Sequence, residues 1–212
     1  MKERPMMFNA EMVRAILDGR KTQTRRIVKS DCMDIGEKDD GTLWPWREHD
    51  NGGDYWYPCP FGEVGDHIWV REAFRVHSKA TDVATLVYRA SERNSWTEQT
   101  HRVPVMACGK PVSPEKWTPS IHMPRWASRI TLEITGVRVE RIASISTESA
   151  RAEGYPAERA ADGGDSDPWL WFRDLWDGIY PEQSFKANPW VWAIEFKRVD
   201  AVKGNSGEGA QS

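Results

Sequence analysis

Short stretches in which apolar and polar residues alternate recur along the chain, separated by glycine- and proline-rich segments. This pattern predicts a protein built mainly from strands. We expect strands at 4–8, 22–28, 67–74, 83–88, 103–106, 127–142 and 189–199, with a bulge at Gly136 where the alternation slips. Apolar residues at helical spacing predict helices at 10–18, 147–153 and 168–180.

Capping residues mark the ends of two of these helices. Asn9 precedes the first helix and Gly19 follows it, which matches the preferred N-cap and the preferred left-handed residue after a helix. Ser146 and Gly154 bracket the short helix at 147–153 in the same way. The chain therefore leaves its first helix at Gly19, directly before its most basic segment.

Other segments carry no regular pattern. Residues 30–61 are polar and glycine-rich and predict a long irregular insertion, anchored by Trp44, Trp46 and Trp56. Residues 94–125 predict mostly loop, and 200–212 a disordered tail. Strands with short helices between them indicate one α+β domain over 1–199, a mixed β barrel with helices at its ends.

Composition narrows the class of protein. Hydrophobic residues make up 39% of the 212 residues, and no apolar run reaches the ~18–20 residues of a spanning helix, so we expect no membrane association. The first residues contain no apolar secretion signal. Cys32, Cys59 and Cys108 are odd in number and far apart, which argues against disulfides. A cytoplasmic location is expected.

One segment differs from the rest of the chain in charge. The net charge is -3, yet residues 18–29 are strongly basic around Thr22 and Thr24. Their cations are Arg20, Lys21, Arg25, Arg26 and Lys29. A basic cluster on an acidic protein is typical of an anion site. A nucleic acid or nucleotide is therefore the first ligand to consider.

Other ligand signals are weak. Cys32, His49, Cys59 and His67 have spacings that match no zinc motif, so no metal is expected. Phosphate-loop and dinucleotide motifs do not occur, so no cofactor is expected either. The 12 tryptophans could stack on bases, but packing in the core is the preferred interpretation.

Four segments together resemble the ASCH domain family, whose fold is PUA-like. They are GRKTQTR at 19–25, Gly65-Asp66 followed by 68–70, ARAEG at 150–154, and the closing helix and strand at 175–180 and 191–197. The resemblance covers about half of the chain. Residues 30–61 and 77–126 exceed the minimal domain, and this long form, with PSIHMPRWASRI at 119–130, looks like phage or prophage proteins acting in a bacterial host cell.

The resemblance implies an activity and a site. Small bacterial ASCH proteins include amidohydrolases that remove the acetyl group of acetylcytidine with a lysine, a threonine and a glutamate. By motif these fall on Lys21, Thr24 and Glu153. Substrate contacts are expected from Arg20, Arg25 and Arg26 of the basic segment, and from Arg71 and Glu72 at the end of an apolar strand.

The chemistry sets a geometric condition. A threonine hydroxyl attacks an amide only when a neighbouring base takes its proton, and a lysine serves only if burial or nearby cations lower its pKa. Lys21 and Thr24 lie on opposite faces of a regular strand, so they meet only if residues 19–22 form a turn. The ordinary alternatives are a solvated lysine, a strand threonine and a helix-surface glutamate.

Three functions follow. The preferred one is an amidohydrolase acting on a modified nucleoside or RNA base. The second is a non-catalytic RNA-binding module in which the basic segment contacts phosphate. The third is a phage accessory or morphogenesis protein whose insertions bind a protein partner.

Overall fold

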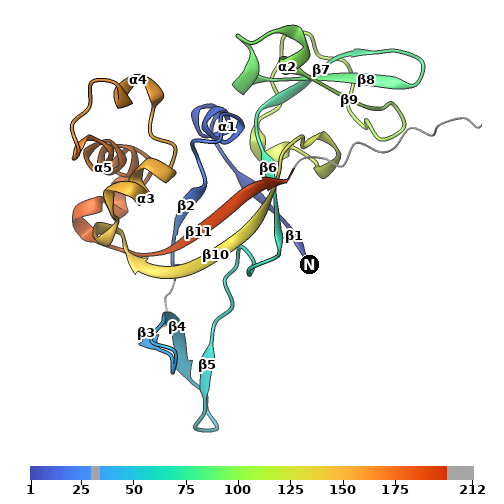
Figure 1. The fold of residues 1–212 in the computed structure, drawn as a ribbon. Coiled ribbons are helices and arrows are strands. Elements are labelled where there is room, and N and C mark those ends of the chain that lie inside the picture. Colours follow the sequence, from blue (N-terminus) through green and yellow to red (C-terminus); the bar gives the residue numbers. More distant parts are fainter. Residues whose placement is uncertain (30–33, 200–212) are drawn as a thin grey trace, which may run out of the picture.

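A five-stranded mixed sheet forms the centre of the computed structural model, which describes residues 1–29 and 34–199 (Figure 1). The strand order is β1-β6-β10-β11-β2. The bounds are β1 Glu3–Met7, β6 His67–Arg71, β10 Thr131–Arg141, β11 Trp190–Val199 and β2 Gln23–Ile27. β1 runs parallel to β6, and the other neighbours are antiparallel. The predicted tail lies outside the described residues.

The two longest strands, β10 and β11, confirm the predicted bulge. Their register shifts between Ile134 and Gly136. A Cβ at Gly136 would lie 3.0 Å from a carboxylate oxygen of Glu195, so glycine suits this crowded position. Apolar residues of β10, β11 and β6 then pack against the first helix around Ile68, Leu132 and Ile194.

The predicted mixed β barrel does not close in the described residues. β1 and β2 are the edges of an open sheet, and no strand ladder joins them. The side chain of Arg26 spans the gap instead, because its Nη2 donates to Met7 O at 3.1 Å. A guanidinium thus connects the two edges where a barrel would have backbone hydrogen bonds.

Four α-helices lie near β2, with α1 on one side of that strand and α3, α4 and α5 on the other (Figure 1). They are α1 Ala10–Leu17, α3 Thr147–Ala152, α4 Ala157–Ala160 and α5 Asp167–Ile179. The predicted caps are confirmed: Asn9 accepts from Met12 N, and Ser146 accepts from Ser149 N. Gly19 and Gly154 both have positive φ. A separate apolar cluster around Ile142, Phe172 and Trp176 fixes α3 and α5 to the sheet.

The prediction of an irregular 30–61 segment is wrong over 34–56, and its first residues, 30–33, lie outside the described residues. β3 Asp34–Glu37, β4 Leu43–Glu48 and β5 Asp54–Trp56 form a three-stranded antiparallel sheet. Aromatic residues hold it together, with Trp46 paired to Trp56 across the strands. Gly36 lies flat against Trp46, since a Cβ there would be 2.5 Å from Trp46 Nε1.

The second insertion forms a third sheet at the opposite end of the molecule (Figure 1). It contains β7 Phe74–Lys79, β8 Val83–Tyr88 and β9 Thr100–Pro104, with α2 Trp96–Gln99 before the last strand. The predicted strand 67–74 is therefore broken into β6 and β7, and the strand predicted at 103–106 begins earlier. The 3-10 helices are η1 Arg89–Ser91, η2 Ser120–His122, η3 Arg125–Ala127, η4 Ile142–Ser144, η5 Pro181–Gln183 and η6 Phe185–Ala187.

Within the described part of the chain, every helix is too short or too polar to cross a membrane.

Candidate active site

The turn after α1 places Lys21 against the end of α3. Gly19 takes a φ of 76°, which a side chain would disfavour, and Lys21 N then donates to Ala15 O at 2.9 Å. Lys21 forms an isolated antiparallel bridge with Glu153. Two segments separated by more than a hundred residues therefore meet at this turn.

Lys21 and Glu153 form a buried ion pair. Lys21 Nζ lies 2.7 Å from Glu153 Oε2 and donates to Glu153 O at 2.9 Å, and the two side chains are 0% and 3% exposed. Burial lowers the pKa of Lys21, while the Glu153 carboxylate opposes that shift; Arg26 and Arg25 lower it further. The amine is thus held where it is more easily neutralised than an exposed lysine.

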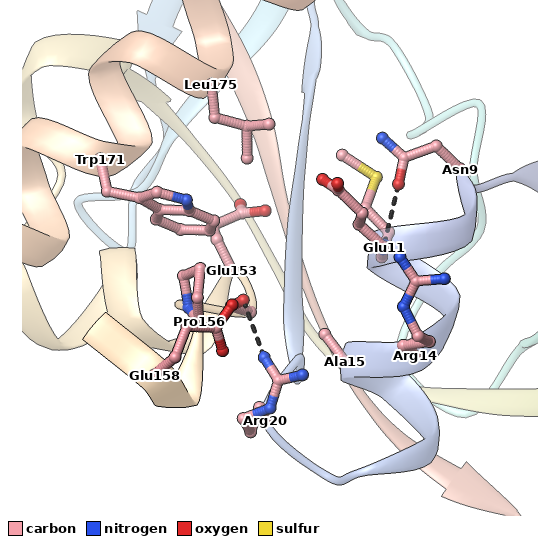
Figure 2. Close-up of a pocket in the computed structure, with 12 residues that line it drawn as sticks. Asn9, Glu11, Arg14, Ala15, Arg20, Glu153, Pro156, Glu158, Trp171 and Leu175 are labelled. Carbon is pink, nitrogen blue, oxygen red and sulfur yellow. Dashed lines mark hydrogen bonds between the residues drawn. The ribbon is translucent and has the colours of Figure 1, made fainter. Parts of the chain in front are cut away.

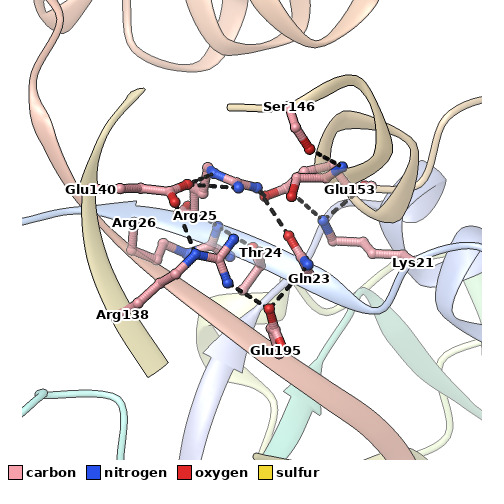
Figure 3. A network of polar contacts seen from close by, with 11 residues as sticks. Lys21, Gln23, Thr24, Arg25, Arg26, Arg138, Glu140, Ser146, Glu153 and Glu195 are labelled. Atoms are coloured by element: carbon pink, nitrogen blue, oxygen red, sulfur yellow. Dashed lines mark hydrogen bonds and ion pairs between the residues drawn. The ribbon is translucent and has the colours of Figure 1, made fainter. Parts of the chain in front are cut away.

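Arg25 extends this pair into a network (Figure 3). Its Nη1 lies 2.9 Å from Glu153 Oε1, and its Nε donates to Glu140 Oε1 at 2.8 Å. The guanidinium also lies over the ring of Phe172 at 5.7 Å. Sequence reasoning missed Glu140, and the signal for it was a carboxylate inside the longest apolar strand.

Thr24 lies apart from that pair. Its side chain is fully buried, and Oγ1 accepts from Arg26 Nη1 at 2.8 Å. Arg26 stacks on Phe8, whereas Arg25 stacks on Phe172, so consecutive residues of β2 face different layers. Both hydrogen bonds that Lys21 Nζ makes to described residues go to Glu153. The structure joins Lys21 to Glu153 and Thr24 to Arg26.

A groove opens between α1 and α5 above these residues (Figure 2). One cavity of about 200 Å³ is lined by Glu153, Trp171 and Leu175 on one side and by α1 on the other. A neighbouring cavity of about 800 Å³ contains Arg26. We call the two together the groove, because Asn9 and Met12 line both. Lys21 and Thr24 line neither cavity, but each contacts a residue that does: Lys21 contacts Glu153, and Thr24 contacts Arg26.

The remaining predicted site residues are placed as follows. Arg20 lines the groove and donates to Gly154 O and Tyr155 O, each at 3.1 Å. Arg71 also lines it, donates to Ser120 O and Ile121 O, and stacks on Trp69. Glu72 lies elsewhere, in a buried ion pair with Arg129 at the base of the β7–β9 sheet. The structure does not bring Glu72 to the Lys21–Glu153 pair.

No group of three or more histidine, cysteine or acidic side chains is arranged to hold a metal ion in the described ranges. Nothing in the groove therefore identifies a metal ligand set.

Comparison with known proteins gives distant likenesses. No family model and no curated protein matches the chain. A crystal structure of an Enterococcus faecalis protein of the DUF984 family superposes with a TM-score of 0.40 and 11% identity, over 98% of this chain and 87% of that one. An ASCH domain from Lactobacillus crispatus gives 0.36 and 13%, over 93% and 79%. The fold is of the mixed α+β class, and membership of the ASCH family stays a prediction.

Proposed function

We propose that the protein is an ASCH-type amidohydrolase that removes an acyl group from the exocyclic amine of a modified base, as in acetylcytidine. The base enters the groove beside Glu153 and Trp171. The observation that carries this proposal is the buried Lys21–Glu153 pair, with its carboxylate on the groove wall and its lysine pKa lowered by burial. An exposed lysine–glutamate pair offers no comparable base, because water keeps the pKa of its lysine near the ordinary value.

The reaction requires Thr24 to attack the amide carbonyl carbon. Neutral Lys21 takes the hydroxyl proton, the C–N bond breaks, and the departing amine takes that proton back from Lys21. Water then cleaves the acyl ester on Thr24 and releases the free acid. For the first step, the Thr24 hydroxyl keeps the hydrogen bond that it accepts from Arg26, and Lys21 Nζ moves to accept the hydroxyl proton when substrate fills the groove.

Arg26 has a second part in this proposal. Its guanidinium holds Thr24 Oγ1 at 2.8 Å and lines the larger cavity of the groove. A cation at this point stabilises negative charge that develops on the threonine oxygen or the carbonyl oxygen. Glu153 is assigned the role of holding Lys21 in place, because it binds Nζ through both its side chain and its backbone.

The non-catalytic RNA-binding module is the second candidate. The observation that favours it is burial: Thr24 is 0% exposed and Lys21 is 2% exposed, so both are covered unless the groove rearranges. In that case the pair is a structural ion pair, and Arg20 and Arg26 provide the contacts to RNA.

One comparison of variants separates the two candidates. Purified protein is incubated with a panel of acylated nucleosides, and products are separated by chromatography. Thr24→Val keeps the size of the side chain and removes the hydroxyl, so it should abolish turnover and leave affinity for the substrate nearly unchanged. Thr22→Val is the matched control, because Thr22 is exposed two residues away.

Full activity of Thr24→Val would refute Thr24 as the nucleophile. Absence of turnover by the wild type on the whole panel, together with tight RNA binding, would establish the binding module instead.

A further inference from the structure

A third cavity lies between α1 and η1, next to the groove. It has a volume of about 440 Å³. Three arginines line it: Arg14 from α1, Arg89 from η1, and Arg93 just beyond η1. The other lining residues are Ala10, Ala90, Glu92 and Asn94. We call it the arginine cavity.

The charge of the arginine cavity is not balanced. Three guanidiniums and one carboxylate give a local charge of +2 on a protein whose net charge is -3. None of the three arginines forms an ion pair with a described residue. Among the described residues, the Arg14 guanidinium donates to Ala90 O alone, at 3.4 Å.

This contrasts with the other arginines near the groove. Arg20, Arg25 and Arg26 are each committed to acceptors within the protein. Like charges that line one cavity repel each other, and an anion in the cavity removes that repulsion. Guanidinium groups also match the oxygens of a phosphate group in pairs. The chemistry of the arginine cavity therefore suits a phosphate.

The position of the arginine cavity relates it to the groove. Arg14 lines both, so the two lie on adjoining faces of α1. A helix with its side chains is about 10–12 Å across. A ligand that fills the groove at Glu153 and reaches Arg89 and Arg93 passes Arg14 on the surface of this helix, a path that a chain of nucleotides can span.

We infer that the arginine cavity binds a backbone phosphodiester of an RNA strand whose modified base occupies the groove. This rests on the proposed function and extends it, since it makes an oligonucleotide the substrate. It also gives the second insertion a role, because Arg89 and Arg93 belong to residues 77–126. Arg14 connects the base in the groove with the phosphate in the cavity.

The test uses a short single-stranded RNA with one acetylated cytidine, and the full-length protein. Binding is followed by fluorescence anisotropy over a range of salt concentrations. The double variant Arg89→Ala/Arg93→Ala removes two cations from the arginine cavity. It should weaken binding and reduce the slope of log affinity against log salt by up to about 0.7, the contribution of one single-strand phosphate contact.

The matched control removes two cations from the same insertion outside the cavity. Arg102→Ala/Lys116→Ala does this, because both residues are exposed and neither lines the arginine cavity. It should leave the salt slope unchanged. Equal losses in both double variants, or no loss in Arg89→Ala/Arg93→Ala, would overturn the inference.

Turnover separates this inference from the proposed function. Arg89→Ala/Arg93→Ala should keep the wild-type kcat/KM on free acetylcytidine and lose it on the oligonucleotide. The amidohydrolase would be refuted if the wild type hydrolyses neither substrate. The phosphate site in the arginine cavity would still be supported if Arg89→Ala/Arg93→Ala selectively weakens RNA binding. If Arg89→Ala/Arg93→Ala lowers kcat/KM on acetylcytidine monophosphate as much as on the oligonucleotide, the arginine cavity binds a terminal phosphate, and binding of a phosphodiester is refuted.

Discussion

Two buried glutamates, Glu153 beside the groove and Glu72 beneath the β7–β9 sheet, have almost the same exposure, 4% and 2%. Each is bound by an arginine. Glu72 accepts from Arg129 at 2.9 and 3.1 Å, and Glu153 accepts from Arg25 at 2.9 Å. The sequence offers both as candidates for a site, yet their surroundings differ.

Glu72 is enclosed by the protein. Its backbone N–H donates to Met123 Sδ, and Arg129 stacks on Tyr88 at 4.1 Å. Arg129 also donates to Ser91 Oγ. This pair therefore fastens the β7–β9 sheet to the central sheet.

Glu153 differs in two respects. It lines a cavity, and its second cation is Lys21, which can lose its proton where an arginine does not. Burial of a carboxylate alone therefore does not identify a site. A titratable partner and an open cavity beside it are the features that distinguish Glu153 from Glu72.

The largest effect on stability is expected where a glutamate has a single cation. Arg129→Met leaves Glu72 buried without a counter-ion, so the free energy of unfolding should fall by about 3–5 kcal/mol. Urea unfolding followed by tryptophan fluorescence measures this. A change no larger than that of the exposed control Arg102→Ala would contradict the structural role of the Glu72 pair.

A smaller loss is expected at the groove. Lys21→Met removes one cation, but Glu153 keeps Arg25 at 2.9 Å, so the free energy of unfolding should fall by only about 1–2 kcal/mol. Turnover should nevertheless be lost, because the base is gone. A stable variant with full activity would show that Lys21 is structural, as Arg129 is.

The smallest effect is expected from a change of pH, which alters the charge of Lys21 and leaves the sequence unchanged. Burial lowers the pKa of Lys21, and the neutral amine is the active form, so kcat/KM should rise with pH up to a plateau reached below the ordinary lysine pKa. The slope should be about tenfold per pH unit below the pKa.

The free energy of unfolding should also rise with pH. Because the unfolded chain binds more protons than the folded one between the two Lys21 pKa values, this group makes the folded state more stable as pH rises through that range. A pH-independent rate over the range would contradict the role of Lys21 as the base.

Local chemistry made much of the fold predictable. Asn9, Gly19 and Gly154 mark helix ends because each satisfies a backbone requirement within a few residues. Gly136 marks the bulge because the apolar alternation slips there, and its contact with Glu195 comes from the neighbouring strand. The β3–β5 sheet was missed because its strands are short and Gly36 and Trp46 complement each other only across the strands.

Long-range contacts account for what the sequence did not indicate at the site. The contact of Arg26 with Met7 O lies between the two edges of the open sheet, and no sequence pattern predicts it. Glu140 and the arginine cavity likewise depend on how distant segments pack. Lys21 and Glu153 were brought together by a motif resemblance, and the structure places them 2.7 Å apart.

The most direct test makes the same substitution at the two glutamates. Glu153→Gln and Glu72→Gln each replace a carboxylate by an amide of the same shape, and kcat/KM on the acylated nucleoside is measured over a range of pH for both folded variants. We expect the pH at which kcat/KM reaches half of its plateau to fall for Glu153→Gln, because the carboxylate that holds up the pKa of Lys21 is removed while Glu153 O still binds Nζ, and to stay at the wild-type value for Glu72→Gln. The same half-plateau pH in the two variants would contradict the role of Lys21 as the base.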